Sequence, residues 1–408
     1  MAAVPNELGE VATSAEIVSD LLGHLTVTTQ RVHRAVARRG FARFLPAPVR
    51  AVQDIVTASV YGLVWAGITV VGTAVVEVLD SVERTRTARP FTTTPRGRHL
   101  AGVLNGAVGD RLHDHYPGLA SPMRIRVDGV DAEPDVATLP RLFPAATGKV
   151  VVFVHGVIET EEWWNTPARA HAADPAAISQ DFGARLTRDL GCSSVHVRYN
   201  SGRHISDNGA DLADLLERLV TAWPVPVREL ALVGHSMGGL VARSALHQAY
   251  ARHLAWSGRT RHLVCLGSPH TGAPLERGAN ILTAVLGGFD ESAPIAALLA
   301  GRSAGIKDLR HGSLHRKDWH GRDPDALHPA SSRHPYRPPD GVEHSNLAAT
   351  AWRAPGPLSD WVGDLLIPTA SALAPTPPAR RCTIPGLHHR DLLTHDAVYT
   401  QLLSWLRT

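Results

Sequence analysis

From Lys149 to Leu266, short apolar runs alternate with longer stretches of helical periodicity. The first run, KVVVFV at 149–154, is continuous and β-branched, which is typical of a buried parallel strand. Further runs follow at 194–199, 229–233 and 262–266, and the helical patterns between them lie near 176–190, at 207–221 and at 238–251. This alternation predicts an α/β fold, with a mostly parallel central sheet and helices on both faces.

The segments outside this core add elements on both sides. Residues 99–114 have a helical pattern, and Met123–Val127 alternates like a strand. Near the other end, a strand is predicted at Arg381–Ile384 and a final helix at 396–407. The span 302–345 interrupts the alternation and is rich in His, Arg, Asp and Pro, so we interpret it as a cap or lid excursion.

One serine lies where a predicted strand gives way to a predicted helix. The run LALV at 230–233 leads into GHSMGG at 234–239, which places Ser236 in a G-x-S-x-G motif. In this context the motif is typical of a nucleophile elbow, a turn so sharp that side chains at Gly234 and Gly238 would collide with backbone. We therefore predict that Ser236 is a catalytic nucleophile. The alternative is a glycine-rich structural turn whose serine takes no part in catalysis.

Composition excludes several other classes of protein. Hydrophobic residues make up 44% of the 408 residues, enough for a sizeable core and too many for a disordered chain. The 41 basic and 38 acidic side chains give a formal charge of +3, too weak a balance to indicate a nucleic-acid partner. The three cysteines cannot form a disulfide framework, and the N-terminus lacks the pattern of a cleaved signal peptide, so we expect a cytoplasmic location.

The first 120 residues differ from the rest, and we predict that 1–120 is a helical extension preceding a catalytic domain at 121–408. Residues 12–45 are basic and helical in pattern, whereas 55–76 carry no charge over 22 residues. That length is enough to span a bilayer, but flanking acidic residues and internal threonines weaken the case. The apolar helix 55–76 therefore either spans a membrane, rests on a membrane surface or packs on the catalytic domain.

Several segments of the chain resemble the lipase and esterase branch of the α/β-hydrolase superfamily over residues 120–408. They are VFVHG at 152–156, GHSMGG at 234–239, LGSPHTG at 266–272, VGDLLIP at 362–368 and LHHRDLLTH at 387–395. The local sequence of these motifs is also similar to that of bacterial lipase-like hydrolases related to the inositol-deacylase type. The resemblance implies an α/β-hydrolase fold and a Ser-acid-His triad in that chain order.

The resemblance places the two partners of Ser236 near the C-terminus. His389, followed by a short spacer and a Leu-Leu pair, is the favoured base, with His388 as the alternative. Asp364, 25 residues before His389, is the favoured acid, with Asp360 as the alternative. The expected oxyanion donors are the backbone N–H groups of Val157, in the loop after the first central strand, and of Met237, at the start of the helix after the serine.

Two other clusters remain open in function. The acidic-aromatic segment at 159–164 (ETEEWW) either bounds the acyl pocket or is a surface loop with its tryptophans packed inward. The histidines of 302–345 lack the spacing of H-E-x-x-H, and we favour a solvated cap over a metal site. These histidines are His311, His315, His320, His328, His334 and His344.

Taken together, the predicted function is a serine hydrolase that cleaves carboxylic esters through an acyl-enzyme. Lipidic acyl esters are the favoured class, because the motifs are lipase-like and the N-terminal segment is apolar. An acyltransferase or thioesterase would use the same triad, and a membrane-associated module without catalysis is the remaining alternative. The expected partner is a small-molecule or lipid ester, with contact to a membrane surface through the apolar segment. No cofactor and no metal are predicted.

Overall fold

A computed structural model describes the chain from residue 95 to residue 407 with several gaps. The gaps are residues 116, 119, 166–180, 274–300, 324–333, 335, 337–338, 355 and 375. The predicted extension before residue 95, including the apolar helix 55–76, lies outside the described residues, as does His328. None of the helices in the described ranges is both long and apolar enough to cross a bilayer.

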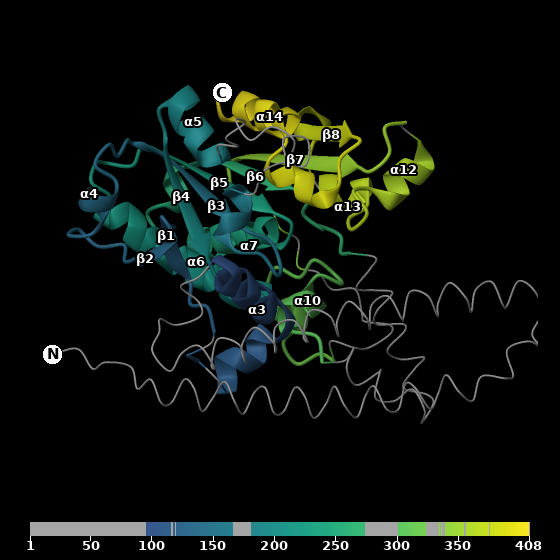
Figure 1. Ribbon diagram of the computed structural model, residues 1–408, viewed down its shortest axis with the longest axis horizontal. Helices are drawn as coiled ribbons and strands as arrows, with labels where there is room; N and C mark the ends of the chain where they lie inside the picture. The colour runs from purple at the N-terminus through teal and green to yellow at the C-terminus, as the bar shows by residue number, and fades with distance from the viewer. Residues whose placement is uncertain are drawn as a thin grey trace, which may run out of the picture.

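The centre of the molecule is an eight-stranded sheet in the order β2-β1-β4-β3-β5-β6-β7-β8 (Figure 1). The strands are β1 Arg124–Val127, β2 Val130–Ala132, β3 Lys149–Val154, β4 Ser193–Arg198, β5 Glu229–His235, β6 Thr260–Leu266, β7 Glu343–Thr350 and β8 Arg381–Pro385. β1 runs antiparallel to both of its neighbours, β2 and β4. The other six strands, in the order β4-β3-β5-β6-β7-β8 across the sheet, are all parallel. The carboxyl ends of these parallel strands therefore meet along one edge.

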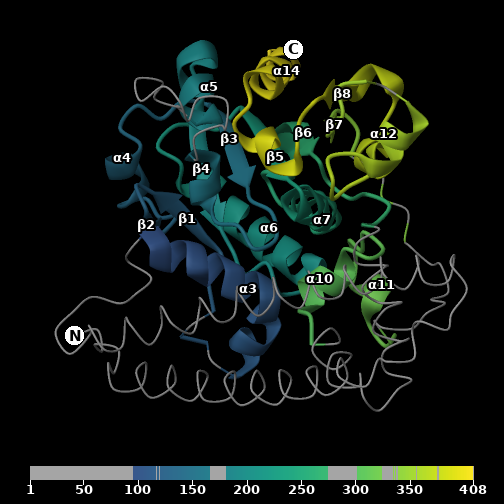
Figure 2. The same ribbon diagram turned by 45° about the vertical axis from the view of Figure 1, so that its right-hand side comes forward.

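Helices cover both faces of this sheet. The α-helices are α3 Pro95–His115, α4 Leu139–Leu142, α5 Phe182–Leu190, α6 Ile205–Ala222, α7 Met237–Ala251, α10 Ala304–Asp308, α11 Arg316–Trp319, α12 Pro357–Val362, α13 Thr369–Leu373 and α14 Asp396–Leu406. Short 3-10 turns are η3 Glu161–Asn165, η5 Ser257–Arg259, η6 Pro378–Arg380 and η7 His389–Leu393. α6 and α7 pack on one face, and α5 and α14 on the other. α3 runs along the α6 side, near α10 (Figure 2).

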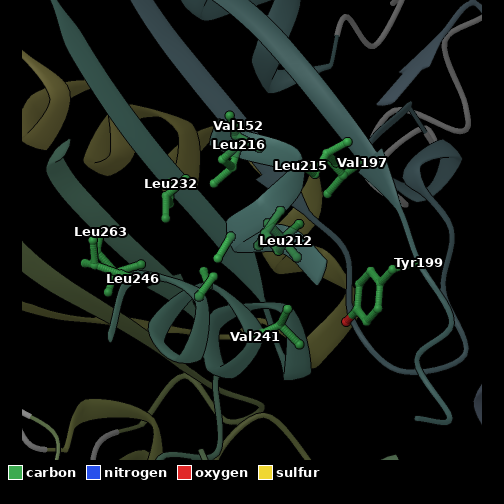
Figure 3. Close-up of a cluster of buried hydrophobic side chains, with 14 of the residues drawn as sticks. Val152, Val197, Tyr199, Leu212, Leu215, Leu216, Leu232, Val241, Leu246 and Leu263 are labelled. Atoms are coloured by element: carbon green, nitrogen blue, oxygen red, sulfur yellow. The ribbon is translucent and has the colours of Figure 1, made fainter. Parts of the chain in front are cut away.

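Alternate residues of the central strands feed two separate cores. In β3, Val150, Val152 and Val154 join the core under α6 and α7, whereas Val151 and Phe153 join the core under α5 and α14. Figure 3 shows the first core, where strand side chains meet leucines and valines of α6 and α7. A strand buried on both faces needs a continuous apolar run, which explains the KVVVFV segment. The predicted α/β fold with a mostly parallel, doubly covered sheet is confirmed.

The structure differs from the sequence prediction at one central strand. β7, Glu343–Thr350, lies between β6 and β8 and was not predicted, and its first residues fall inside the supposed excursion 302–345. Its sequence, EHSNLAAT, begins with four polar residues, yet seven of the eight are buried. A buried strand is usually recognised by a run of apolar residues, so the hydrophobic pattern alone could not detect β7. The excursion therefore ends before residue 343.

Candidate active site

Ser236 lies at the sharp turn between β5 and α7. Its backbone has φ 52° and ψ −123°, a conformation that non-glycine residues adopt only where the surrounding structure enforces it. Backbone segments around the serine lie so close together that only glycine fits at positions 234 and 238. A Cβ on Gly238 would lie 2.2 Å from the carbonyl oxygen of Val154, and one on Gly234 would lie 2.4 Å from Gly239 Cα. The serine is 6% exposed, at the carboxyl edge of the sheet.

His389 and Asp364 meet through their side chains. His389 Nδ1 lies 2.6 Å from Asp364 Oδ2, and both residues are buried. The other carboxyl oxygen, Oδ1, accepts the backbone N–H groups of Leu366 and Ile367 at 3.0 and 2.8 Å. An ionised carboxylate is an acceptor only, so Nδ1 donates to Asp364, and in the neutral imidazole the lone pair then lies on Nε2. That tautomer suits a general base.

The imidazole of His389 lies beside the serine turn. The Ser236 N–H donates to the carbonyl oxygen of Leu266 at 2.8 Å, and the next residue along the chain is Gly267. A Cβ on Gly267 would lie 3.1 Å from His389 Cε1. From the other side, the ring of His235 has its centroid 4.7 Å from that of His389. The structure thus gathers Ser236, His389 and Asp364 from three distant segments.

The alternative residues lie in other surroundings. His388 precedes η7, and its N–H donates to Asp391 Oδ2 at 2.8 Å. Asp360 is exposed in the first turn of α12, where its N–H donates to the carbonyl oxygen of Gly356 at 2.9 Å. The favoured members of the two pairs, His389 and Asp364, are therefore those that contact each other.

The two predicted oxyanion donors belong to segments that adjoin the serine. Met237 is the first residue of α7, so its N–H belongs to the free amide groups of the helix N-terminus. Val157 follows Gly156, and a Cβ on Gly156 would lie 3.0 Å from Ser236 Cβ. His155 orders this loop, because its Nδ1 is 2.8 Å from the carbonyl oxygen of Gly156 and its Nε2 is 3.3 Å from the Tyr199 N–H. Burial lowers the pKa of His155, which keeps it neutral.

Comparison with known proteins agrees with this architecture. Residues 145–287, from β3 through β6, match the family model described as PGAP1-like alpha/beta domain. Together with the order of the strands, this match is consistent with an α/β-hydrolase fold. The recognition made from the sequence motifs is thereby confirmed. No curated protein matches the chain.

Distant structural neighbours of this chain include three bacterial enzymes. Lipase BlEst2 of Bacillus licheniformis, in mature form, is 18% identical over 64% of this chain and 93% of its own, with a TM-score of 0.39. RedJ thioesterase, from the prodiginine pathway of Streptomyces coelicolor, is 23% identical over 64% and 91%, with a TM-score of 0.33. A thermophilic esterase of Thermogutta terrifontis is 17% identical over 64% and 90%, with a TM-score of 0.34.

The α/β-hydrolase core contains a pair of buried ionisable residues that the sequence did not single out. Glu159 Oε2 lies 3.0 Å from His235 Nδ1 and accepts the Gly156 N–H at 2.6 Å. His235 Nε2 lies 3.1 Å from the carbonyl oxygen of His389. His235 precedes the nucleophile within GHSMGG, but no local pattern indicates that it contacts a residue 76 positions earlier.

The tryptophans of the acidic-aromatic segment occupy different places. Trp164 is fully buried, and its ring packs edge-on against Phe153 with centroids 5.0 Å apart. Trp163 is only partly buried, and the Arg390 guanidinium lies 4.2 Å from its ring centroid. Arg390 follows His389, so Trp163 braces the loop that carries the candidate base. The inward-packed alternative therefore applies to Trp164.

Among the residues described, one group offers three side chains with metal-ligand atoms within 4.8 Å of one another: Cys265, His270 and His344. Its surroundings do not suit a cation. Arg243 Nη1 lies 2.6 Å from His270 Nδ1, and burial together with this guanidinium lowers the pKa of both histidines, that of His344 to about 3. Burial raises the pKa of Cys265 to about 12, so the thiol stays protonated.

Proposed function

We propose that this protein is a serine hydrolase that cleaves carboxylic esters through an acyl-enzyme intermediate. The observation that carries the proposal is the 2.6 Å contact between His389 Nδ1 and Asp364 Oδ2, placed beside a serine held in a strained strand-to-helix turn. A nucleophile, a base of fixed tautomer and an orienting carboxylate are the three parts that acyl transfer requires. Each has its position fixed by backbone contacts.

The chemistry follows from these positions. Ser236 Oγ attacks the ester carbon while His389 Nε2 takes its proton, and Asp364 stabilises the imidazolium that forms. The backbone N–H groups of Val157 and Met237 receive the developing oxyanion, and each such donor contributes about 3 kcal/mol to transition-state stabilisation. His389 then returns the proton to the leaving alcohol. Water repeats the sequence on the acyl-enzyme and releases the acid.

Lipidic acyl esters are the substrate class that the surface favours. Four large apolar side chains are exposed around the candidate acid; we call them the apolar patch. They are Trp352 at 46%, Trp361 at 71%, Leu365 at 58% and Leu366 at 43% exposure. The Ala351 N–H donates to the carbonyl oxygen of Gly363 at 2.8 Å, which ties the segment of Trp352 to the end of α12. Exposed apolar groups gathered at one place mark a surface that contacts apolar partners.

A direct test uses the purified chain with p-nitrophenyl esters of short and medium acyl length. We expect release of p-nitrophenol and covalent labelling by a fluorophosphonate, and loss of both on Ser236→Ala. Ser404→Ala changes an exposed serine in α14 and should alter neither. Labelling that survives Ser236→Ala would reject the assignment. Products formed with an added acceptor alcohol separate hydrolysis from acyl transfer, which the same residues would catalyse.

A further inference from the structure

A buried polar chain links the segments that carry the candidate catalytic groups. Glu159 and His235 are 5% and 0% exposed. One oxygen of Glu159, Oε2, accepts the Gly156 N–H at 2.6 Å and lies 3.0 Å from His235 Nδ1. At its other nitrogen, His235 reaches the carbonyl oxygen of His389 at 3.1 Å. These contacts thus link the loop of the candidate oxyanion donor Val157, through His235 next to Ser236, to the backbone of His389.

The protons in this chain can be placed from donor and acceptor chemistry. A carbonyl oxygen only accepts, so the nitrogen of His235 that faces His389 carries a proton. Burial raises the pKa of Glu159 and lowers that of His235, but their mutual attraction and the hydrogen bonds that each accepts or donates together outweigh burial in both. The net pKa of Glu159 falls below its ordinary value, and that of His235 rises above its own. With Glu159 Oε2 at one ring nitrogen of His235 and a carbonyl oxygen at the other, the arrangement favours a carboxylate paired with an imidazolium.

The groups that face His235 suit an imidazolium. The carboxylate of Asp364 also raises its pKa, and the backbone oxygen of His389 accepts one of its protons. The edge of Trp164 closes a third side, with ring centroids 6.4 Å apart. Another neighbour is the His389 ring, at 4.7 Å between centroids. Buried ion pairs add little net stability compared with apolar residues, so stability alone does not account for a pair at this place.

We propose that Glu159 and His235 act as a positioning pair that fixes the oxyanion loop and the base relative to Ser236. Glu159 holds Gly156, the residue before the donor Val157, and His235 holds the main chain of His389. Both side chains act through main-chain groups, at Gly156 and at His389. The inference rests on the proposed function, since it assigns the pair to the geometry of that same site. Misplacement of about 1 Å in such a site lowers rates about 100-fold.

Glu159→Gln tests the carboxylate. In Glu159→Gln no negative charge remains to hold a second proton on His235, so Nδ1 loses its proton. The Gly156 N–H then needs an oxygen, and the unprotonated Nδ1 needs an N–H donor. Both partners face the same atom of residue 159, and one atom of an amide cannot be both. We expect kcat to fall about 10- to 100-fold with KM within about threefold of the parent value. The matched control is Glu161→Gln in the same segment, a buried glutamate that pairs with Arg126 and Arg198. It should lower stability and leave kcat unchanged.

A double variant tests whether the two residues act as one unit. We expect Glu159→Gln with His235→Phe to lose about as much kcat as the worse single variant, because a linked chain is broken only once. Losses that multiply would overturn the proposal, as would a loss of kcat in Glu161→Gln as large as that in Glu159→Gln. Kinetics are normalised to the fraction that a fluorophosphonate labels, which counts folded sites.

The state of His235 can be read in the unaltered protein, which avoids any variant that does not fold. Nitrogen-15 NMR of labelled histidines should show one doubly protonated ring at pH 7 that is absent in His235→Phe. A His235 with a single protonated nitrogen would overturn the proposal. Failure of the proposed function is distinguishable, because it would appear as no ester cleavage and no loss of labelling in Ser236→Ala, whatever the spectrum of His235.

Discussion

At the residue scale, the adjacent histidines 388 and 389 make different contacts. His389 Nδ1 contacts the carboxylate of Asp364, whereas the backbone N–H of His388 donates to Asp391 at the start of η7. We expect His389→Ala to lower kcat about 10³-fold or more, since the nucleophile loses its base. His388→Ala should leave kcat within about twofold of the parent value in steady-state assays on p-nitrophenyl esters. A reversed result would move the base to His388.

The carboxylate partner can be examined in the same way. Asp364 holds the Nδ1 proton of His389, so Asp364→Asn should favour the wrong tautomer and lower kcat about 10⁴-fold, as in other triads. Asp360→Asn is the matched control, because Asp360 is exposed in the first turn of α12. Steady-state kinetics of both variants at one pH measure the effect. Equal losses in the two variants would contradict the assignment.

The ion pair of Glu159 and His235 makes stability depend on pH. The folded pKa of His235 lies above its ordinary 6.5, so its stabilising contribution is complete below pH 6.5 and is lost as the pH rises through the folded pKa. The pKa of Glu159 lies below 4.5, and this group stays ionised throughout that window. We expect the difference in unfolding free energy between the parent and His235→Phe to shrink from pH 6 to pH 9. Urea unfolding measures it, and a constant difference would contradict the ion pair.

At the scale of elements, the turn between β5 and α7 depends on close backbone contact. A Cβ at Gly238 would lie 2.2 Å from the oxygen of Val154, so Gly238→Ala must displace α7 from β3. We expect a loss of about 1–3 kcal/mol in stability and most of the activity. Gly258→Ala is the control, because nothing lies within 4 Å of a Cβ there. Thermal unfolding and ester cleavage report both effects, and a fully active Gly238→Ala would contradict the close contact.

The strands differ in how well they can be predicted from their sequences. β3 and β5 are apolar on both faces and follow a simple rule of burial, so the sequence predicted them almost to the residue. β7 is buried by polar side chains that find partners inside the protein, such as Asn346, whose side chain donates to the Ala374 carbonyl oxygen at 3.1 Å. Pattern reasoning treats polar residues as exposed, and it fails where tertiary hydrogen bonds satisfy them.

At the scale of the whole molecule, the candidate site combines local and long-range information. Ser236 could be recognised from six consecutive residues, because the glycines and flanking elements form one local signal. His389 and Asp364 were found through a family resemblance and a chain order, and the structure adds their contact. The link of Glu159 to His235 joins residues 76 apart and has no periodic signature. Only the assembled fold places these two side chains together.

The apolar patch gives the molecule an asymmetric surface, and its orientation should matter for substrates held in an aggregate. Burying an exposed tryptophan or leucine side chain in a lipid phase contributes about 1.5–3 kcal/mol. We expect Trp361→Ser, at the 71% exposed position, to raise the apparent KM for an emulsified ester by about 10-fold. The reaction with dissolved p-nitrophenyl acetate should be unchanged, because Trp361 lies on α12 and outside the triad.

Tyr250 provides the control for that experiment, since it is also an exposed aromatic residue, at 57%, but lies near the far end of α7. Tyr250→Ser should affect neither substrate. If Trp361→Ser slows the dissolved and the emulsified ester equally, the patch supports the loop of Asp364 and does not contact the lipid. If Tyr250→Ser weakens the reaction on the emulsion as much, general surface hydrophobicity is responsible. A selective loss in Trp361→Ser alone identifies the carboxyl edge of the sheet as the side that faces a lipid ester.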